Sequence, residues 1–79
     1  MAIHKSVHTY AVKRNEKGYS VTNIQTGQRY MEGKHFGSSN PQVTAVLYVA
    51  QRDTSYTFFD DDVKFLGSVG DKDIYLVSV

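Results

Sequence analysis

Apolar and polar residues alternate along the first third of the chain, a pattern that is typical of strands rather than of a helix. Residues 7–13 and 19–25 are rich in β-branched and aromatic side chains and follow no helical period. A four-residue loop at 15–18 separates them, which predicts a hairpin. A second turn at 26–27 then leads to a third strand at 28–32. The first third of the chain is therefore predicted to be a three-stranded meander.

One later segment has the period of an amphipathic helix. Asn40 suits the N-cap position, and Pro41 suits the first helical position, where its missing N–H costs nothing. Four apolar residues follow at i, i+3, i+4 and i+7, which predicts a helix over about residues 40–52. The members of this apolar stripe are Val43, Val46, Leu47 and Ala50.

The rest of the chain again has strand character. Residues 55–59, 63–69 and 74–79 are rich in aromatic and β-branched side chains, and an acidic turn separates the first two. The last segment is apolar on both faces of its pleat, so we expect it inside a sheet rather than at an edge. The element order βββαβββ predicts a single small α+β domain over residues 1–79, in which one helix packs on an antiparallel sheet.

The register of the meander decides which of its faces can meet a partner. With the loops above, Val12 pairs with Val21, Tyr10 pairs with Asn23, and the second turn pairs Asn23 with Tyr30. One face then carries three tyrosines and the other carries smaller or aliphatic side chains that suit close approach of a helix. The tyrosines are either core residues or an exposed recognition platform, and a one-residue slip would exchange the faces. The tyrosine face holds Tyr10, Val12, Tyr19, Val21 and Tyr30; the other face holds Thr9, Ala11, Thr22, Ile24 and Met31.

Composition removes several classes of function. The 79 residues include no cysteine, which excludes disulfides, thiolate metal sites and a cysteine nucleophile. No Ser/His/Asp set and no pair of carboxylates in a plausible cleft can be assigned, so we expect neither enzymatic activity nor a cofactor. The longest apolar run, residues 45–50, is far too short to span a bilayer, and the N-terminus has no signal-peptide pattern. These features predict a cytoplasmic protein without a membrane partner.

Charge is distributed unevenly along the chain. The formal net charge is only +1, but residues 1–40 carry six Lys or Arg against two Glu, whereas residues 41–79 carry three against six Asp. Basic and tyrosine residues early in the chain favour DNA or RNA binding by the meander, which is our first hypothesis. The residues that we expect to contact nucleic acid are Tyr10, Lys13, Arg14, Lys17, Tyr19, Arg29, Tyr30 and Lys34.

The order of three strands and a helix over residues 9–51 is similar to that of the AP2-type DNA-binding domains. Gly18-Tyr19 and the segment 26–29 fall where such a meander has its turns. This resemblance rests on element order and turns, and it implies a DNA-binding role for the meander. The strands predicted after the helix have no counterpart in it.

Our second hypothesis is a stoichiometric protein-binding inhibitor or adaptor of the kind that phages and other mobile elements encode. The acidic run of Asp60, Asp61 and Asp62 suits imitation of nucleic acid or docking on a basic groove. Exposed strand edges suit pairing with a partner's sheet or formation of a homodimer. The two hypotheses differ in which half of the chain binds.

Metal and anion sites are less favoured. His4 and His8 lie about 13 Å apart along an extended chain, which is too far for joint chelation. The adjacent carboxylates of the acidic run point to opposite sides, so we expect a solvated turn and no metal site. The glycine-bracketed loop at 33–40 could place Lys34 and backbone N–H groups around a phosphate at the helix start, or its serines could cap the helix themselves.

Overall fold

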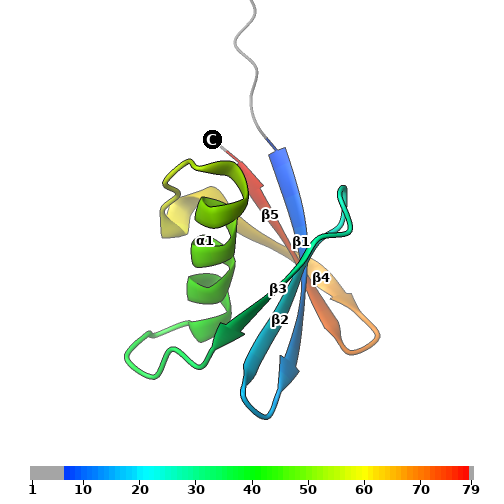
Figure 1. The fold of residues 1–79 in the computed structure, drawn as a ribbon, viewed down its shortest axis with the longest axis vertical. Coiled ribbons are helices and arrows are strands. Elements are labelled where there is room, and N and C mark those ends of the chain that lie inside the picture. Colours follow the sequence, from blue (N-terminus) through cyan, green and yellow to red (C-terminus); the bar gives the residue numbers. More distant parts are fainter. Residues whose placement is uncertain (1–6, 79) are drawn as a thin grey trace, which may run out of the picture.

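A single α-helix lies on one side of a five-stranded antiparallel sheet in the computed structural model, which describes residues 7–78 (Figure 1). The strand order across the sheet is β3-β2-β1-β5-β4. The predicted α+β class, with an antiparallel sheet and one helix, is confirmed. In chain order the elements are β1 (Val7–Asn15), β2 (Gly18–Asn23), β3 (Arg29–Gly33), α1 (Pro41–Thr54), the 3₁₀ turn η1 (Asp60–Asp62), β4 (Val63–Val69) and β5 (Lys72–Ser78).

The β1–β2 hairpin has the predicted register and a shorter loop. Val12 lies opposite Val21 as predicted, but Asn15 also pairs with Gly18, so the loop is two residues long rather than four. A Cβ on Gly18 would lie 2.0 Å from the backbone carbonyl oxygen of Glu32. Glycine is therefore required here, because its lack of a side chain lets β3 approach β2 at this end of the hairpin.

The β2–β3 turn is wider than predicted. Tyr30 lies opposite Val21 rather than Asn23, so the predicted register is wrong by two residues. The side-chain oxygen of Asn23 accepts hydrogen bonds from the N–H groups of Gln25 (2.9 Å) and Thr26 (3.1 Å), which stabilises the longer turn. Because side chains alternate with a period of two, a shift of two residues leaves the paired side chains of β2 and β3 on their predicted faces.

Helix α1 begins as predicted and ends two residues later. The side chain of Asn40 accepts a hydrogen bond from the N–H of Val43 at 3.3 Å, and Pro41 occupies the first turn. After the last turn Ser55 adopts a left-handed conformation with φ of 66°, and its N–H bonds to the carbonyl of Gln51 at 2.8 Å. No helix in the described part of the chain has the length and apolar character needed to cross a membrane.

The segment 55–59, which follows α1, is not the predicted strand. Its backbone is interrupted at one end by the left-handed Ser55 and at the other by η1, where the Asp62 carboxylate accepts the N–H of Phe59 at 2.8 Å. The segment instead brings Phe58, which is 5% exposed, into the core beside the helix. Strand β5 lies between β1 and β4, so its predicted place inside the sheet is confirmed.

Helix α1 covers the tyrosine face of the meander, which corrects the assignment of faces made from the sequence. Tyr10, Val12 and Val21 are at most 1% exposed. Tyr19 and Tyr30 are partly buried and pack against the same core. The face that was predicted to lie beneath the helix has no helix over it (Figure 1); it carries Thr9, Ala11, Thr22 and Met31, whereas Ile24 lies in the turn after β2.

The side chains that α1 turns toward the sheet account for this choice of face. Ala45, Val46, Val49 and Ala50 are buried on the inner surface of the helix, and two of them belong to the predicted apolar stripe. Their small size leaves room for the large tyrosine rings on the opposing strands, which allows close packing. Large side chains on the sheet thus pack against small side chains on the helix.

Candidate nucleic-acid interface

Two of the three phenol groups of the meander, those of Tyr10 and Tyr30, are hydrogen-bonded to the helix. Asp53, in the last turn of α1, accepts hydrogen bonds from the hydroxyl of Tyr10 (2.9 Å), the hydroxyl of Tyr30 (2.7 Å) and the side-chain amide of Asn23 (2.6 Å). Tyr10 is therefore a core residue and not part of an exposed platform, which corrects its predicted role as a contact residue. The hydroxyl of Tyr30 is likewise occupied in joining the sheet to the helix.

Hydrogen bonding keeps Asp53 ionised. Burial alone would raise the pKa of its carboxyl group, but the donors Tyr30, Asn23 and Tyr10 stabilise the carboxylate more strongly and hold the pKa below its usual value. Burial and the neighbouring carboxylate together raise the pKa of Tyr10 well above its usual value. At neutral pH the phenol therefore stays a donor and the carboxylate stays an acceptor.

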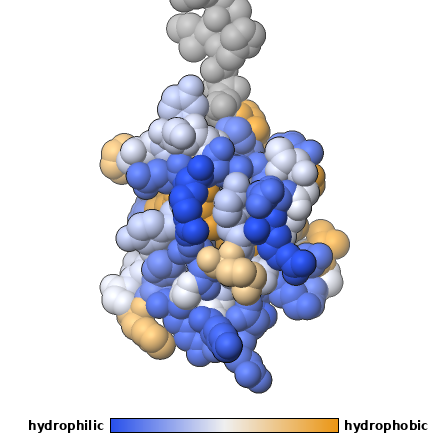
Figure 2. Space-filling model, in the orientation of Figure 1, coloured by the Kyte–Doolittle hydropathy of each residue, from blue (hydrophilic) through white to orange (hydrophobic). Residues whose placement is uncertain are grey.

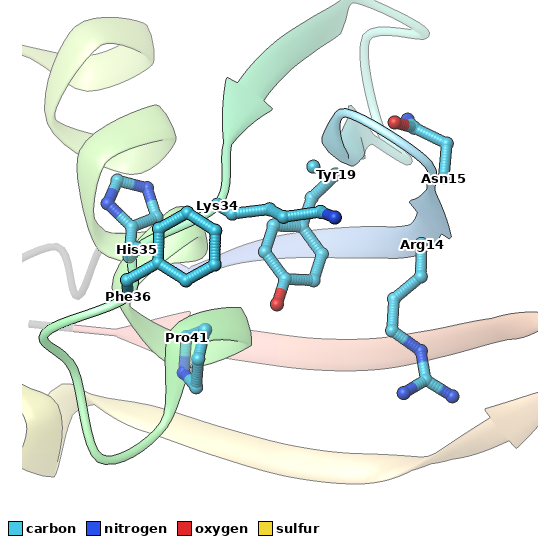
Figure 3. Close-up of a pocket in the computed structure, with 8 residues that line it drawn as sticks. Arg14, Asn15, Tyr19, Lys34, His35, Phe36 and Pro41 are labelled. Carbon is cyan, nitrogen blue, oxygen red and sulfur yellow. The ribbon is translucent and has the colours of Figure 1, made fainter.

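The predicted basic contact residues do not share one surface. Arg14 and Lys34 lie on the helix-covered side, where they line a hollow of about 200 Å³ together with Tyr19 (Figure 3). Lys13 and Arg29 lie on the opposite, uncovered face of the sheet, as the pairing registers require. The prediction of a single cationic, tyrosine-bearing surface is therefore wrong, because the sheet itself separates the two sets of cations.

We call the sheet face that α1 leaves uncovered the open face. Its cations include two lysines that were not among the predicted contact residues. The pairing registers place Lys13, Arg29, Lys64 and Lys72 on it, and all four are exposed. The strand positions of the open face that the structure describes include no Asp, no Glu and no aromatic residue. Lys17, another predicted contact residue, is exposed at the tip of the β1–β2 loop, at the end of this face.

Three of these cations surround a hollow of about 250 Å³ in the open face. Lys13, Arg29 and Lys72 line it, and Ser20 and Thr22 contribute hydroxyl groups beside them. Long cationic side chains and hydroxyl groups are the side chains that most often contact the phosphate oxygens of nucleic acids. None of the carboxylates of residues 7–78 lines this hollow. The arrangement can therefore bind the phosphate backbone of a nucleic acid.

One carboxylate lies at the margin of the open face. Asp71, in the β4–β5 turn, pairs with Lys13 at 3.2 Å, and both side chains are more than half exposed. The hydrogen bond and the charge of Lys13 lower the pKa of Asp71. Exposed ion pairs are weak because water and salt screen them. A phosphate group can therefore compete with Asp71 for Lys13.

The acidic run that carries the second hypothesis lies in η1, beside α1. Asp62 is engaged by the N–H of Phe59, while Asp60 and Asp61 are exposed. Among residues 7–78, no group of three or more His, Asp or Glu side chains is arranged to hold a metal ion. The His4 member of the histidine pair considered above lies outside the described residues.

The loop before α1 caps itself, as in the second of the two alternatives considered for it. The hydroxyl oxygen of Ser38 accepts the N–H of Asn40 at 3.2 Å, and Asn40 in turn caps the N–H of Val43. The N–H groups of Asn40 and Val43 are thus already hydrogen-bonded to side chains of the protein.

Lys64, Lys72 and Asp53 are the residues that the sequence reasoning missed. Charge counting placed both lysines in the acidic half of the chain, yet strand pairing brings Lys72 opposite Lys13. Alternation held a usable signal, because Lys72, Ile74 and Leu76 occupy one face of any strand that contains them. For Asp53, by contrast, the sequence pattern indicated only a position near the end of the helix and not a contact with the tyrosines.

Comparison of the chain with models of protein families, with curated proteins and with solved structures finds no match in any of the three.

Proposed function

We propose that the protein binds double-stranded nucleic acid on the open face of its sheet. The observation that carries this proposal is the hollow lined by Lys13, Arg29 and Lys72 with two hydroxyl side chains and no carboxylate. Neutralising several phosphates at once releases condensed counterions, which is the main source of sequence-independent affinity for nucleic acids. Lys64, farther along the same face, extends the cationic surface toward β4.

The absence of aromatic rings from the described strand positions of the open face favours a duplex over a single strand. Proteins that bind single strands stack the unpaired bases on aromatic side chains, whereas duplexes keep their bases stacked and offer their phosphates. The apolar residues of the open face are aliphatic, namely Ala11, Ile74, Leu76 and Met31 among others. Such a surface gives phosphate contacts and close approach without a stacking platform.

The affinity for a short blunt-ended DNA duplex should fall steeply with salt. Three phosphate contacts predict a slope of about −2.7 in log affinity against log salt, which is about a 40-fold loss between about 50 mM and about 200 mM. Fluorescence anisotropy of the labelled duplex measures this, with a single strand of the same sequence as the control. No anisotropy change at the lowest salt, with DNA or with RNA duplex, would exclude the proposal.

A second candidate function is protein binding along β4, one of the two edge strands of the sheet. Phe65, Leu66 and Val69 are each more than half exposed there, and a free edge strand can pair with a strand of another chain. In the view of Figure 2, hydrophobic residues form separate spots among hydrophilic ones. The partner that we consider is a second copy of the chain, paired through β4 of each copy.

If β4 joins two copies, light scattering after size-exclusion chromatography should give twice the mass of the chain. Leu66→Lys should restore the monomer mass, because it places a charge in the joined edges, whereas Lys64→Gln should leave the dimer intact. A monomer mass at every concentration would remove this candidate. It would leave the open-face proposal unaffected.

A further inference from the structure

The hollow on the helix-covered side is built differently from the one in the open face. It lies where β1 and β2 meet the loop that leads into α1, and it has a volume of about 200 Å³ (Figure 3). We call it the ring pocket, after the rings of Tyr19, Phe36 and Pro41 that form its apolar walls. Two cations, Arg14 and Lys34, also line it.

Flat apolar surface in the ring pocket is available to a ligand. Phe36 is 89% exposed, so its ring has almost no cover from the protein. Tyr19 is partly buried: its ring packs against the core and also lines the pocket. In Figure 3 the ring of Phe36 and the stem of Lys34 lie beside the ring of Tyr19, and Pro41 closes one side.

Positive charge in the ring pocket is not balanced by the chain. Among residues 7–78, no ion pair engages Arg14 or Lys34, and no carboxylate lines the pocket. His35 also lines the pocket, and it already has partners in the chain: its Nε2 lies 3.2 Å from Glu32, and its ring stacks on Tyr48 with centroids 5.1 Å apart. The pocket thus combines exposed rings with two available cations.

We propose that the ring pocket binds a single nucleotide, with its base against Phe36 and Tyr19 and its phosphate at Arg14 or Lys34. Bases of every kind stack on aromatic side chains, and guanidinium groups match the geometry of phosphate oxygens. Pockets for drug-sized ligands have volumes of ~300–1,000 Å³, so this smaller hollow suits one ring system, with the phosphate outside it at the exposed cations Arg14 and Lys34. The nucleotide is either a free mononucleotide or the terminal nucleotide of a strand. The proposal concerns the side opposite the open face and does not depend on duplex binding there.

Titration of the isotope-labelled protein with adenosine 5′-monophosphate, followed by amide NMR, tests this proposal. The signals of Gly18, Tyr19 and Phe36 should shift together, and adenosine or inorganic phosphate alone should bind more weakly, because each supplies half of the contacts. Phe36→Ala should weaken binding at least tenfold, since it removes a stacking partner. Phe59→Ala is the matched control, because Phe59 is also exposed and lies in the segment before η1, outside the pocket.

The source of the nucleotide follows from a comparison of duplexes. If a one-nucleotide overhang tightens binding of a duplex to the native protein but not to Phe36→Ala, the source is the end of a strand. If the pocket binds the monophosphate but the overhang has no effect, the source is a free mononucleotide. The proposal is overturned if the monophosphate shifts no pocket signal, or if Phe36→Ala binds it as tightly as the native protein does. Duplex affinity measured in parallel separates either result from failure of the open-face proposal.

Discussion

Asp53→Asn should lower the free energy of unfolding by about 2–3 kcal/mol, because hydrogen bonds to an ionised group each contribute about 1.5–3 kcal/mol and are not additive here. One carboxylate oxygen accepts from both Tyr10 and Asn23, and the other accepts from Tyr30. An amide offers a single acceptor and turns its own donor toward at least one of these groups. Urea denaturation at neutral pH measures the loss.

This loss is large relative to the whole stability of the domain. A chain of 79 residues is stable by only about 4–12 kcal/mol. Asp61→Asn makes the same charge change at an exposed carboxylate and should stay within about 0.5 kcal/mol of the native protein. If the two variants unfold at the same urea concentration, Asp53 does not hold the sheet to the helix.

The pH dependence of stability gives a second measurement of the same contact. The folded-state pKa of Asp53 lies below its usual value, so its contribution is fully present above about pH 4, the pKa of an unfolded aspartate. It is lost as the pH falls through the folded-state pKa. The native protein should therefore lose stability over that acidic range, and Asp53→Asn should lose less.

The strand pairings of the meander could be predicted because they depend on local signals. Turn residues fixed the β1–β2 register, and the period of two made the faces insensitive to the two-residue error at Tyr30. The helix start was predictable for the same reason, since Asn40 and Pro41 are sufficient to specify it. Each of these features is decided within a few residues of sequence.

The side on which the helix packs could not be predicted in that way. It depends on Asp53, which supplies acceptors for Tyr10 and Tyr30 from 43 and 23 residues away, and on small helix residues that make room for the rings. The sequence argument weighed the size of the side chains on the sheet alone and so favoured the wrong face. A buried tyrosine needs a partner for its hydroxyl, and that partner came from an element far along the chain.

The residues of the candidate interface could be predicted only in part, for a related reason. Lys13 and Arg29 were predicted as contact residues, but Lys72 joins them only because β5 pairs with β1 in the sheet. A charge count along the chain averages Lys72 with its acidic neighbours, whereas alternation along the strand separates it from Asp73. Cations lie on both faces of the sheet, but the described strand positions of the open face carry no carboxylate, and this difference between faces does not follow the two halves of the chain.

That difference gives the most discriminating test of function. Replacing Arg29 and Lys72 together with glutamate should weaken duplex binding about 200-fold or more at about 50 mM salt, because two counterion-releasing contacts are lost. The slope of log affinity against log salt should fall from about −2.7 to about −0.9. Both side chains are exposed, so the thermal stability of the variant should change little.

The matched control is Arg14→Glu with Lys34→Glu, which makes the same change in net charge on the helix-covered side. Under the open-face proposal this control keeps most of its affinity for a blunt duplex, because the remaining long-range effect of its charge is screened by salt. It should instead lose the nucleotide from the ring pocket, which the open-face variant retains. Equal weakening of duplex binding by the two pairs would mean that net charge alone drives association, and the open face would then have no special role.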